Sequence, residues 1–159
     1  MAFAENTSVS VERSQAEIQQ TLRRYGVTEF AVMSGTVSSA VAFKIGGKAR
    51  MSVKMEIGMP DPKAEIYLYS RAGTWNKKRR TDEAARACWE QACRSRWRAL
   101  LLCIKAKLEA VAAGISTMEI EFMAFIVCDD GRVVHERLLP QMHQAAENGS
   151  APTRLQLTM

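Results

Sequence analysis

Histidine is scarce in this chain, with two in 159 residues, and the spacing of the two does not suit a shared metal ion. His135 and His143 are eight positions apart, whereas the paired ligands of a helical HExxH metal site lie on adjacent turns. No serine or cysteine is adjacent to a histidine, so nucleophilic catalysis has no candidate. We therefore expect no enzyme activity, no metal site and no cofactor.

Cysteine pairs and long apolar runs are also missing. The four cysteines form no CxxC motif, and Cys88, Cys93 and Cys103 fall within one predicted helix. Cys88 and Cys93 lie about 140° apart around such a helix, which does not suit a shared metal ion. No apolar stretch approaches the roughly 20 residues of a membrane span, and the first residues lack the pattern of an export signal. We expect a cytoplasmic protein with reduced core cysteines and no membrane partner.

Positive charge is concentrated in one segment. Between Arg71 and Lys107 there are eleven Lys or Arg and three acids, so this segment carries +8 in a chain whose formal charge is +5. The remaining residues are therefore net acidic. A localised charge of this kind is typical of a surface that binds a polyanion, most often nucleic acid.

The hydrophobic pattern predicts an α+β fold, in which a four-stranded antiparallel meander packs on one long central helix. Four stretches separated by Gly, Ser and Pro are typical of strands: residues 30–34, 40–45, 49–57 and 64–69. In the third stretch, Met51, Val53, Met55 and Ile57 alternate with polar residues. This alternation indicates a sheet with one face in water.

The long helix is predicted from Thr81 to Ala113, with Gly114 as its stop. Its large apolar side chains share one face: Trp89, Cys93, Trp97, Leu100, Ile104, Leu108 and Val111. A second face is made of small residues: Cys88, Ala92, Ser95, Ala99, Cys103, Ala106, Ala110 and Ala113. We expect the sheet on the large face, and the C-terminal helices or a second subunit on the small one, so a homo-oligomer is one alternative.

Short helices are predicted at both ends of the chain. Capping boxes begin at Ser14 and Ser116, so we expect one helix over residues 14–25 and another that extends to Ile126. A last short helix is expected around Pro140.

A turn and a tail complete the predicted organisation. The Asp130-Gly131 pair lies between residues 126–127 and 133–134, which predicts a small hairpin. We expect a single domain over residues 1–147 and a mobile C-terminal tail over residues 148–159.

The basic side chains of the 71–80 loop and of the long helix form the candidate binding site. We predict nucleic-acid binding by the following residues, with the indole stacking on a base: Arg71, Trp75, Lys77, Lys78, Arg79, Arg80, Arg94, Arg98 and Lys105. The alternative for the loop is a solvated segment without a ligand. Trp89 and Trp97 are predicted core residues. Tyr67 and Tyr69 share one face of the fourth strand, where they either stack on bases or cover a second hydrophobic layer.

A further signal lies in three parts of the chain. These are TSVSVERSQAEIQQTLRRYG at residues 7–26, WEQACRSRWRALLLCIKAKLEAVAAGIST at 89–117, and DDGRVV at 129–134 with LLPQM at 138–142. Together they resemble a family of small uncharacterised proteins of tailed phages and prophages, while residues 27–69 carry no part of the likeness. The resemblance implies a phage origin and a role inside the infected bacterial host. It implies no activity, cofactor or catalytic residue.

Three functions agree with these patterns. The first is a phage-encoded nucleic-acid-binding accessory protein that handles single strands in replication or recombination, with DNA expected in preference to RNA. The second is an inhibitor of a host defence complex that contacts an acidic host protein surface through its basic loop. The third is an enzyme or nucleotide binder with a pocket between sheet and long helix, for which the sequence has no supporting motif.

Overall fold

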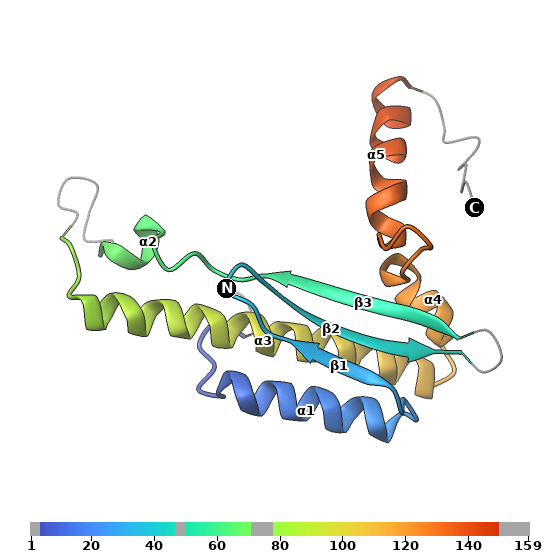
Figure 1. The fold of residues 1–159 in the computed structure, drawn as a ribbon, viewed down its shortest axis with the longest axis horizontal. Helices are drawn as coiled ribbons and strands as arrows, with labels where there is room; N and C mark the ends of the chain where they lie inside the picture. The colour runs from blue at the N-terminus through green and yellow to red at the C-terminus, as the bar shows by residue number, and fades with distance from the viewer. Residues whose placement is uncertain (1–3, 47–49, 71–77, 150–159) are drawn as a thin grey trace.

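A three-stranded antiparallel sheet packs by one face against the long helix α3 and the N-terminal helix α1 (Figure 1). The computed structural model describes residues 4–46, 50–70 and 78–149. In chain order the elements are α1 (Val11–Arg24), β1 (Phe30–Met33), β2 (Ser38–Ile45), β3 (Met51–Gly58), α2 (Glu65–Leu68), α3 (Asp82–Ala112), α4 (Met118–Phe122), the 3-10 helix η1 (Met123–Phe125) and α5 (Val134–Glu147). The predicted α+β class and long central helix are confirmed.

The alternation of side chains along the strands decides which face of the sheet is buried. The strand order is β1-β2-β3, and Val41 and Phe43 on β2 lie opposite Met55 and Val53 on β3. All four of these side chains are buried. Lys44, which points to the other face, is exposed. The sheet therefore has one covered and one open face, as the alternating pattern predicted.

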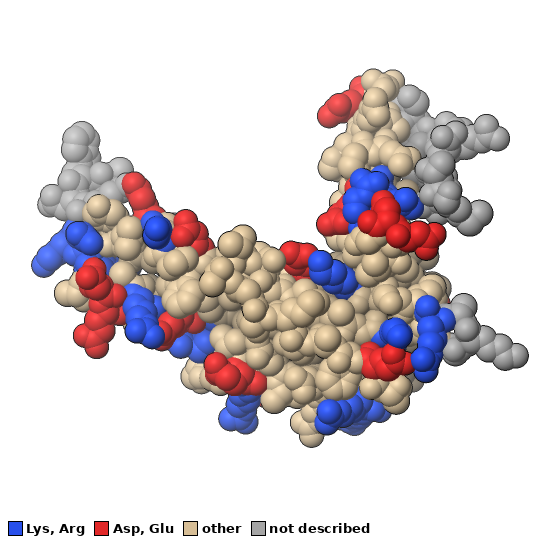
Figure 2. All heavy atoms as spheres, in the orientation of Figure 1, with Lys and Arg blue, Asp and Glu red and all other residues tan. Residues whose placement is uncertain are grey.

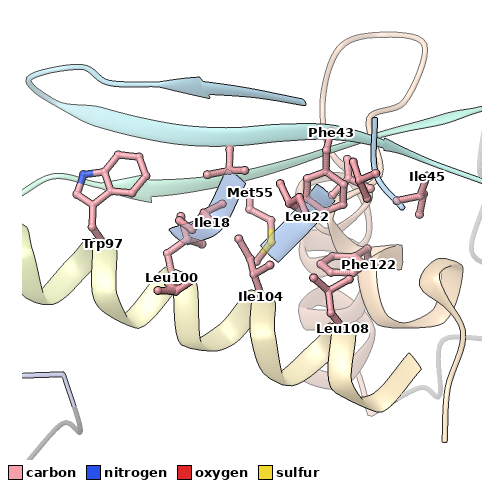
Figure 3. Packing of buried hydrophobic residues seen from close by; sticks show 14 residues of the cluster. Ile18, Leu22, Phe43, Ile45, Met55, Trp97, Leu100, Ile104, Leu108 and Phe122 are labelled. Atoms are coloured by element: carbon pink, nitrogen blue, oxygen red, sulfur yellow. The ribbon is translucent and has the colours of Figure 1, made fainter. Parts of the chain in front are cut away.

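The core lies between the inner face of the sheet and the helices (Figure 3). The buried side chains that α3 contributes to this core are Trp97, Leu100, Leu101, Ile104 and Leu108. Ile18 and Leu22 of α1 join them, and Phe122 of α4 meets the ring of Phe43 edge-on with 5.1 Å between centroids. Burial of each large apolar side chain contributes about 1.5–3 kcal/mol. The predicted large face of the long helix is thus the face that packs on the sheet.

The predicted fourth strand is wrong, because residues 64–69 form the one-turn helix α2 and its C-terminal cap. The chain turns immediately before it, where the N–H of Lys63 donates to Oδ1 of Asp61. The carbonyl oxygen of Pro60 accepts from the indole Nε1 of Trp89, 2.8 Å away. These contacts direct the segment toward the start of α3 and away from the edge of β3. In the described parts of the chain the sheet therefore has three strands.

The ends of the first and third helices test the capping predictions. Helix α1 begins one turn before the predicted start, because Ser10 is its N-cap and accepts the N–H of Arg13. Ser14 lies inside the helix and is fully buried. In α3 the predicted stop is confirmed, since Gly114 follows the C-cap Ala113 with a φ of 69°. Thr81 is the N-cap of α3, and its Oγ1 accepts the N–H of Ala84.

The C-terminal region differs from the prediction in its helices and agrees in its hairpin. The helix that begins after Thr117 does not reach Ile126, which instead forms a bridge with Val53 of β3. The expected small hairpin is present as a bridge between Val127 and Val133. Helices α1 and α5 have 14 residues each, more than the mean of about 11–12. The description of both terminal helices as short is therefore not confirmed.

Helix α5 projects away from the sheet and from α3 (Figure 1). None of its residues is buried. It is attached at its base, where Nδ1 of His135 lies 2.8 Å from the carbonyl oxygen of Ala124 and Nε of Arg137 lies 3.2 Å from Oδ2 of Asp130. Residues 150–159, which make up most of the predicted tail, lie outside the described residues.

The small-residue face of α3 is covered only at its beginning in the described part of the molecule. The amide of Gln91 donates to the carbonyl oxygens of Glu5 and Thr7, and the hydroxyl of Ser95 donates to that of Glu5. Farther along, Ala99, Cys103 and Ala106 are exposed. The described C-terminal helices do not bury these three residues, and packing by a second subunit stays a prediction.

Candidate nucleic-acid interface

The predicted basic loop is only partly within the described residues. Arg71, Trp75 and Lys77 lie outside them. Lys78 and Arg79 are exposed, and Nη2 of Arg79 lies 3.7 Å from Oδ1 of Asp82. Since this distance is long and both side chains are exposed, the pair leaves Arg79 available to an anionic ligand.

Arg80 has a structural role that the sequence did not indicate. Its Nη1 atom lies 2.9, 3.1 and 2.6 Å from the carbonyl oxygens of Ile66, Tyr67 and Tyr69. Its own N–H donates to the carbonyl oxygen of Leu68. Arg80 therefore satisfies the free carbonyls at the end of α2 and fastens this helix to the start of α3.

The two tyrosines of the predicted fourth strand lie in this same segment. Tyr67 belongs to α2 and Tyr69 is its C-cap, and both are half-buried. Tyr69 also forms an isolated bridge with Arg79. The shared strand face on which both interpretations of the tyrosines depended is therefore absent.

Three basic side chains surround one carboxylate between α1 and α3. Glu17 lies 2.9 Å from Nη1 of Arg98, 3.6 Å from Nζ of Lys105 and 3.6 Å from Nε of Arg13. Burial alone raises the pKa of Glu17, but the hydrogen bond from Arg98 and the charges of Arg98 and Lys105 together outweigh it and lower the pKa. The structure thus brings together two of the predicted site residues, Arg98 and Lys105, around a common counter-ion.

Arg94 lies one turn before Arg98 on α3 and has a different partner. Its Nε and Nη2 atoms lie 3.1 and 2.6 Å from Oε1 of Gln91. It lies twelve residues after Asp82, the first residue of α3, which is about 18 Å along the helix. The loop residues and the α1-facing residues of α3 are therefore two separate basic regions along one helix.

A groove of about 1010 Å³ runs between α1 and α3. It is lined by Arg13, Ala16, Glu17, Gln20, Thr21, Arg23, Arg24, Tyr25, Lys105 and Glu109. Four of these residues are basic and two are acidic. The hydroxyl of Tyr25 donates to Oε1 of Glu109 within this groove, and that hydrogen bond raises the pKa of the tyrosine. We refer to these ten residues as the α1–α3 groove.

The arginines of α1 are the part of the groove that the sequence prediction missed. Arg13, Glu17, Gln20 and Arg24 are spaced by four, three and four residues. This spacing places them on one face of a helix. This spacing can be read from the sequence, whereas the concentration of charge between Arg71 and Lys107 indicates only the loop and α3.

Positive charge is not segregated on the face seen in Figure 2, where Lys and Arg side chains lie beside Asp and Glu. The described ion pairs explain this mixture, since Arg86 is 2.9 Å from Glu90 and Arg132 is 2.7 Å from Asp130. A ligand that binds by charge must therefore compete with acidic side chains of the protein itself.

Metal-binding clusters and membrane-spanning helices are both absent from the described residues. These residues contain no group of three or more His, Cys, Asp or Glu placed to hold a metal ion. Within the same ranges no helix has the length and apolar character needed to traverse a bilayer. Comparison of the chain with protein-family models, with curated proteins and with solved structures gives no match.

Proposed function

We propose that this protein binds the phosphate backbone of a nucleic acid along the α1–α3 groove. The observation that carries the proposal is the groove itself, in which four basic side chains outnumber two acids. Arginine and lysine neutralise the phosphates of a nucleic acid and so release the counterions bound to them. This release supplies most of the free energy of sequence-independent binding. The exposed Lys78 and Arg79, which lie just before α3, supply a second contact region.

The carboxylate of Glu17 positions these basic groups more than it competes with a phosphate for them. It is contacted by Arg13, Arg98 and Lys105, so a single negative charge holds three positive ones in place. A guanidinium has five N–H donors, and a contact to Glu17 leaves others for a phosphate oxygen. The groove therefore retains a net positive charge after its internal ion pairs are formed.

Single-stranded DNA is the partner that we propose should be tested first. The setting is the replication or recombination of a tailed phage, in the cytoplasm of its bacterial host, and this part of the proposal rests on the sequence resemblance. The test is a titration of the full chain with single- and double-stranded DNA and RNA across a range of salt concentrations. Affinity should fall steeply with salt, because each neutralised phosphate releases a counterion.

Two sets of variants locate the binding surface. Arg13→Ala with Arg24→Ala should lower the salt slope by roughly 1.4 for a single strand, because each phosphate that is no longer neutralised accounts for about 0.7. Glu17 keeps Arg98 and Lys105 in this variant, so the fold should be retained. Lys77→Ala, Lys78→Ala and Arg79→Ala test the loop. Arg80 is left in place, because it holds the end of α2.

The matched control removes two positive charges elsewhere. Lys63→Ala with Arg132→Ala changes the net charge equally, and Asp130 keeps Arg137 at 3.2 Å. If the control loses as much affinity as the variant of Arg13 and Arg24, the loss reflects the net charge of the protein and not the groove. Absence of binding by the unmodified chain at low salt would refute the proposal.

A second function, contact with a host protein, is favoured by helix α5. Its side chains include exposed Leu139 and Met142, and its base carries exposed Met123. A projecting helix with apolar side chains is suited to insertion into a groove of a partner. Leu139→Ser with Met142→Ser should abolish co-purification of a host protein and leave nucleic-acid affinity unchanged if this function holds.

A further inference from the structure

A second cavity lies at the end of the core, where the sheet stops and α3 continues. Its volume is about 510 Å³, which is within the range of roughly 300–1,000 Å³ for small-molecule pockets. It is bordered by the start of α1, the β1–β2 turn, Met59 and α3. We refer to it as the end cavity.

The inner part of the end cavity is apolar and aromatic. Trp97 and Cys93, which line it, are 1% and 6% exposed. Met59 and Trp89 line it as well and are half-buried. The indole N–H of Trp89 is already bonded to the carbonyl oxygen of Pro60 at 2.8 Å, which fixes the orientation of the ring. Such a lining suits a planar ring that stacks or packs against sulfur and indole.

Polar groups are found among the other lining residues. The hydroxyl residues Ser34 and Thr36 of the β1–β2 turn belong to the lining, and its charged residues are Glu12, Glu90 and Arg94. Glu90 is paired with Arg86 at 2.9 Å. Arg94 uses Nε and Nη2 on Gln91, and a guanidinium has further donors for a phosphate. A ligand with a planar ring and hydrogen-bonding edges matches the inner lining, and Arg94 is the lining residue that can receive an anionic group attached to it.

We infer that the end cavity binds a single nucleobase of a single-stranded nucleic acid, with Arg94 at the adjoining phosphate. The inference rests on the proposed function and adds a base-binding site to it. Trp89, predicted from the sequence to be a core residue, is then the stacking residue within the described chain. Arg98 follows Arg94 by four residues on α3, about 6 Å along the helix. The nucleic-acid strand therefore continues from the cavity toward Glu17 and its basic partners.

The test compares two probes of equal length on the full chain. One is an oligothymidylate, and the other is an abasic deoxyribose-phosphate oligomer, which has the same backbone without bases. Stacking of one base should make the oligothymidylate bind about 5- to 150-fold more tightly. An aromatic peptide is titrated as a third probe.

Thr36→Trp fills the mouth of the cavity from an exposed turn position. It should remove the difference between the two oligomers and leave the affinity for the abasic one unchanged. The matched control is Val37→Trp, which adds the same side chain at a neighbouring position that is 80% exposed and does not line the cavity. Trp89→Leu is a second variant that removes the indole. Melting curves verify that each variant is folded.

The outcomes separate this inference from the proposed function. If both oligomers bind equally, or if Thr36→Trp and Trp89→Leu preserve the difference, the base-binding site is refuted while backbone binding stands. If neither oligomer binds, both proposals fail. A third outcome concerns the aromatic peptide. If the peptide binds, if neither oligomer competes with it, and if Thr36→Trp abolishes its binding, the cavity belongs to a protein partner and the inference is overturned.

Discussion

Arg98 of α3 and Glu17 of α1 form an ion pair across 81 positions of sequence, with 2.9 Å between Nη1 and Oε2. Both side chains are about one quarter exposed, at 25% and 26%. The pair joins the two helices that form the α1–α3 groove. It is therefore part of the architecture as well as of the proposed binding surface.

The pH dependence of stability should report on Glu17. The pKa of Glu17 in the folded chain lies below the ordinary value of 4.5. Its contribution to the free energy of unfolding is therefore fully present above pH 4.5 and is lost as the pH falls through the folded pKa. Glu17→Gln should cost about 0.5–1 kcal/mol at pH 7 and should flatten the acid part of the profile. Urea unfolding between pH 7 and pH 2 measures both effects.

The control for Glu17 is an exposed pair on a single helix. Arg86 and Glu90 lie 2.9 Å apart, with side chains that are 78% and 42% exposed. Glu90→Gln should change stability by less than about 0.5 kcal/mol. If Glu17→Gln and Glu90→Gln have the same profile, the link between α1 and α3 contributes nothing specific.

The large face of α3 should be the most sensitive part of the fold. Ile104 is completely buried within the core, so Ile104→Val should cost about 0.5–1.5 kcal/mol and Ile104→Asp should prevent cooperative folding. Ile115, which is 81% exposed just after α3, provides the control, and Ile115→Asp should melt like the unmodified chain. Thermal unfolding followed by circular dichroism measures all three. A cooperative transition in Ile104→Asp would contradict the assigned core.

Arg80 should act on the stability of α2 and little on binding. Arg80→Ala removes the donor for three carbonyl oxygens, each hydrogen bond to a charged group contributing about 1.5–3 kcal/mol at most. We expect faster hydrogen exchange at Tyr69 and Leu68 than in Arg79→Ala, whose only described ion pair is exposed. Equal exchange in the two variants would show that the carbonyl contacts are not maintained in solution.

The thiols should react in the order of their burial. Burial raises the pKa of Cys93, and the charge of Glu90 adds to the effect while Arg94 opposes it. Less thiolate and less access both slow alkylation, so Cys93 should be modified last and the exposed Cys103 first. Peptide mass spectrometry after iodoacetamide treatment at pH 8 measures the order, which should disappear in urea. Early modification of Cys93 would place it outside the core.

The helix ends and turns that depend on contacts between residues close in the chain could be predicted from the sequence. Gly114 as the stop of α3 and the Asp130-Gly131 turn both depend on a glycine with a positive φ, 69° and 80° respectively. Ser10 and Ser14 compete for the same role, since each is followed by residues suited to a first helical turn. Ser10 is the N-cap because Ser14 is buried on the side of α1 that faces the core. The spacing of residues within α1 does not contain this information.

The remaining errors concern contacts between distant segments. Residues 64–69 were predicted to be a strand, yet the hydrogen bond from Trp89 to Pro60 holds this part of the chain near α3 across 29 positions. The candidate site has the same difficulty. Arg98 and Lys105 were predicted as ligands of a polyanion, whereas their shared contact with Glu17 arises only when α1 packs on α3. No spacing within either helix contains that information.

Helix α5 has a consequence for the cooperativity of unfolding. Its 14 residues bury no side chain, and isolated helices shorter than roughly 12–15 residues are marginal in water. Pro140 within it also removes one backbone hydrogen bond. The helix should therefore melt at lower denaturant concentration than the core around Trp97. Far-ultraviolet dichroism and tryptophan fluorescence should accordingly give non-coincident transitions, so one free energy of unfolding does not describe the whole chain.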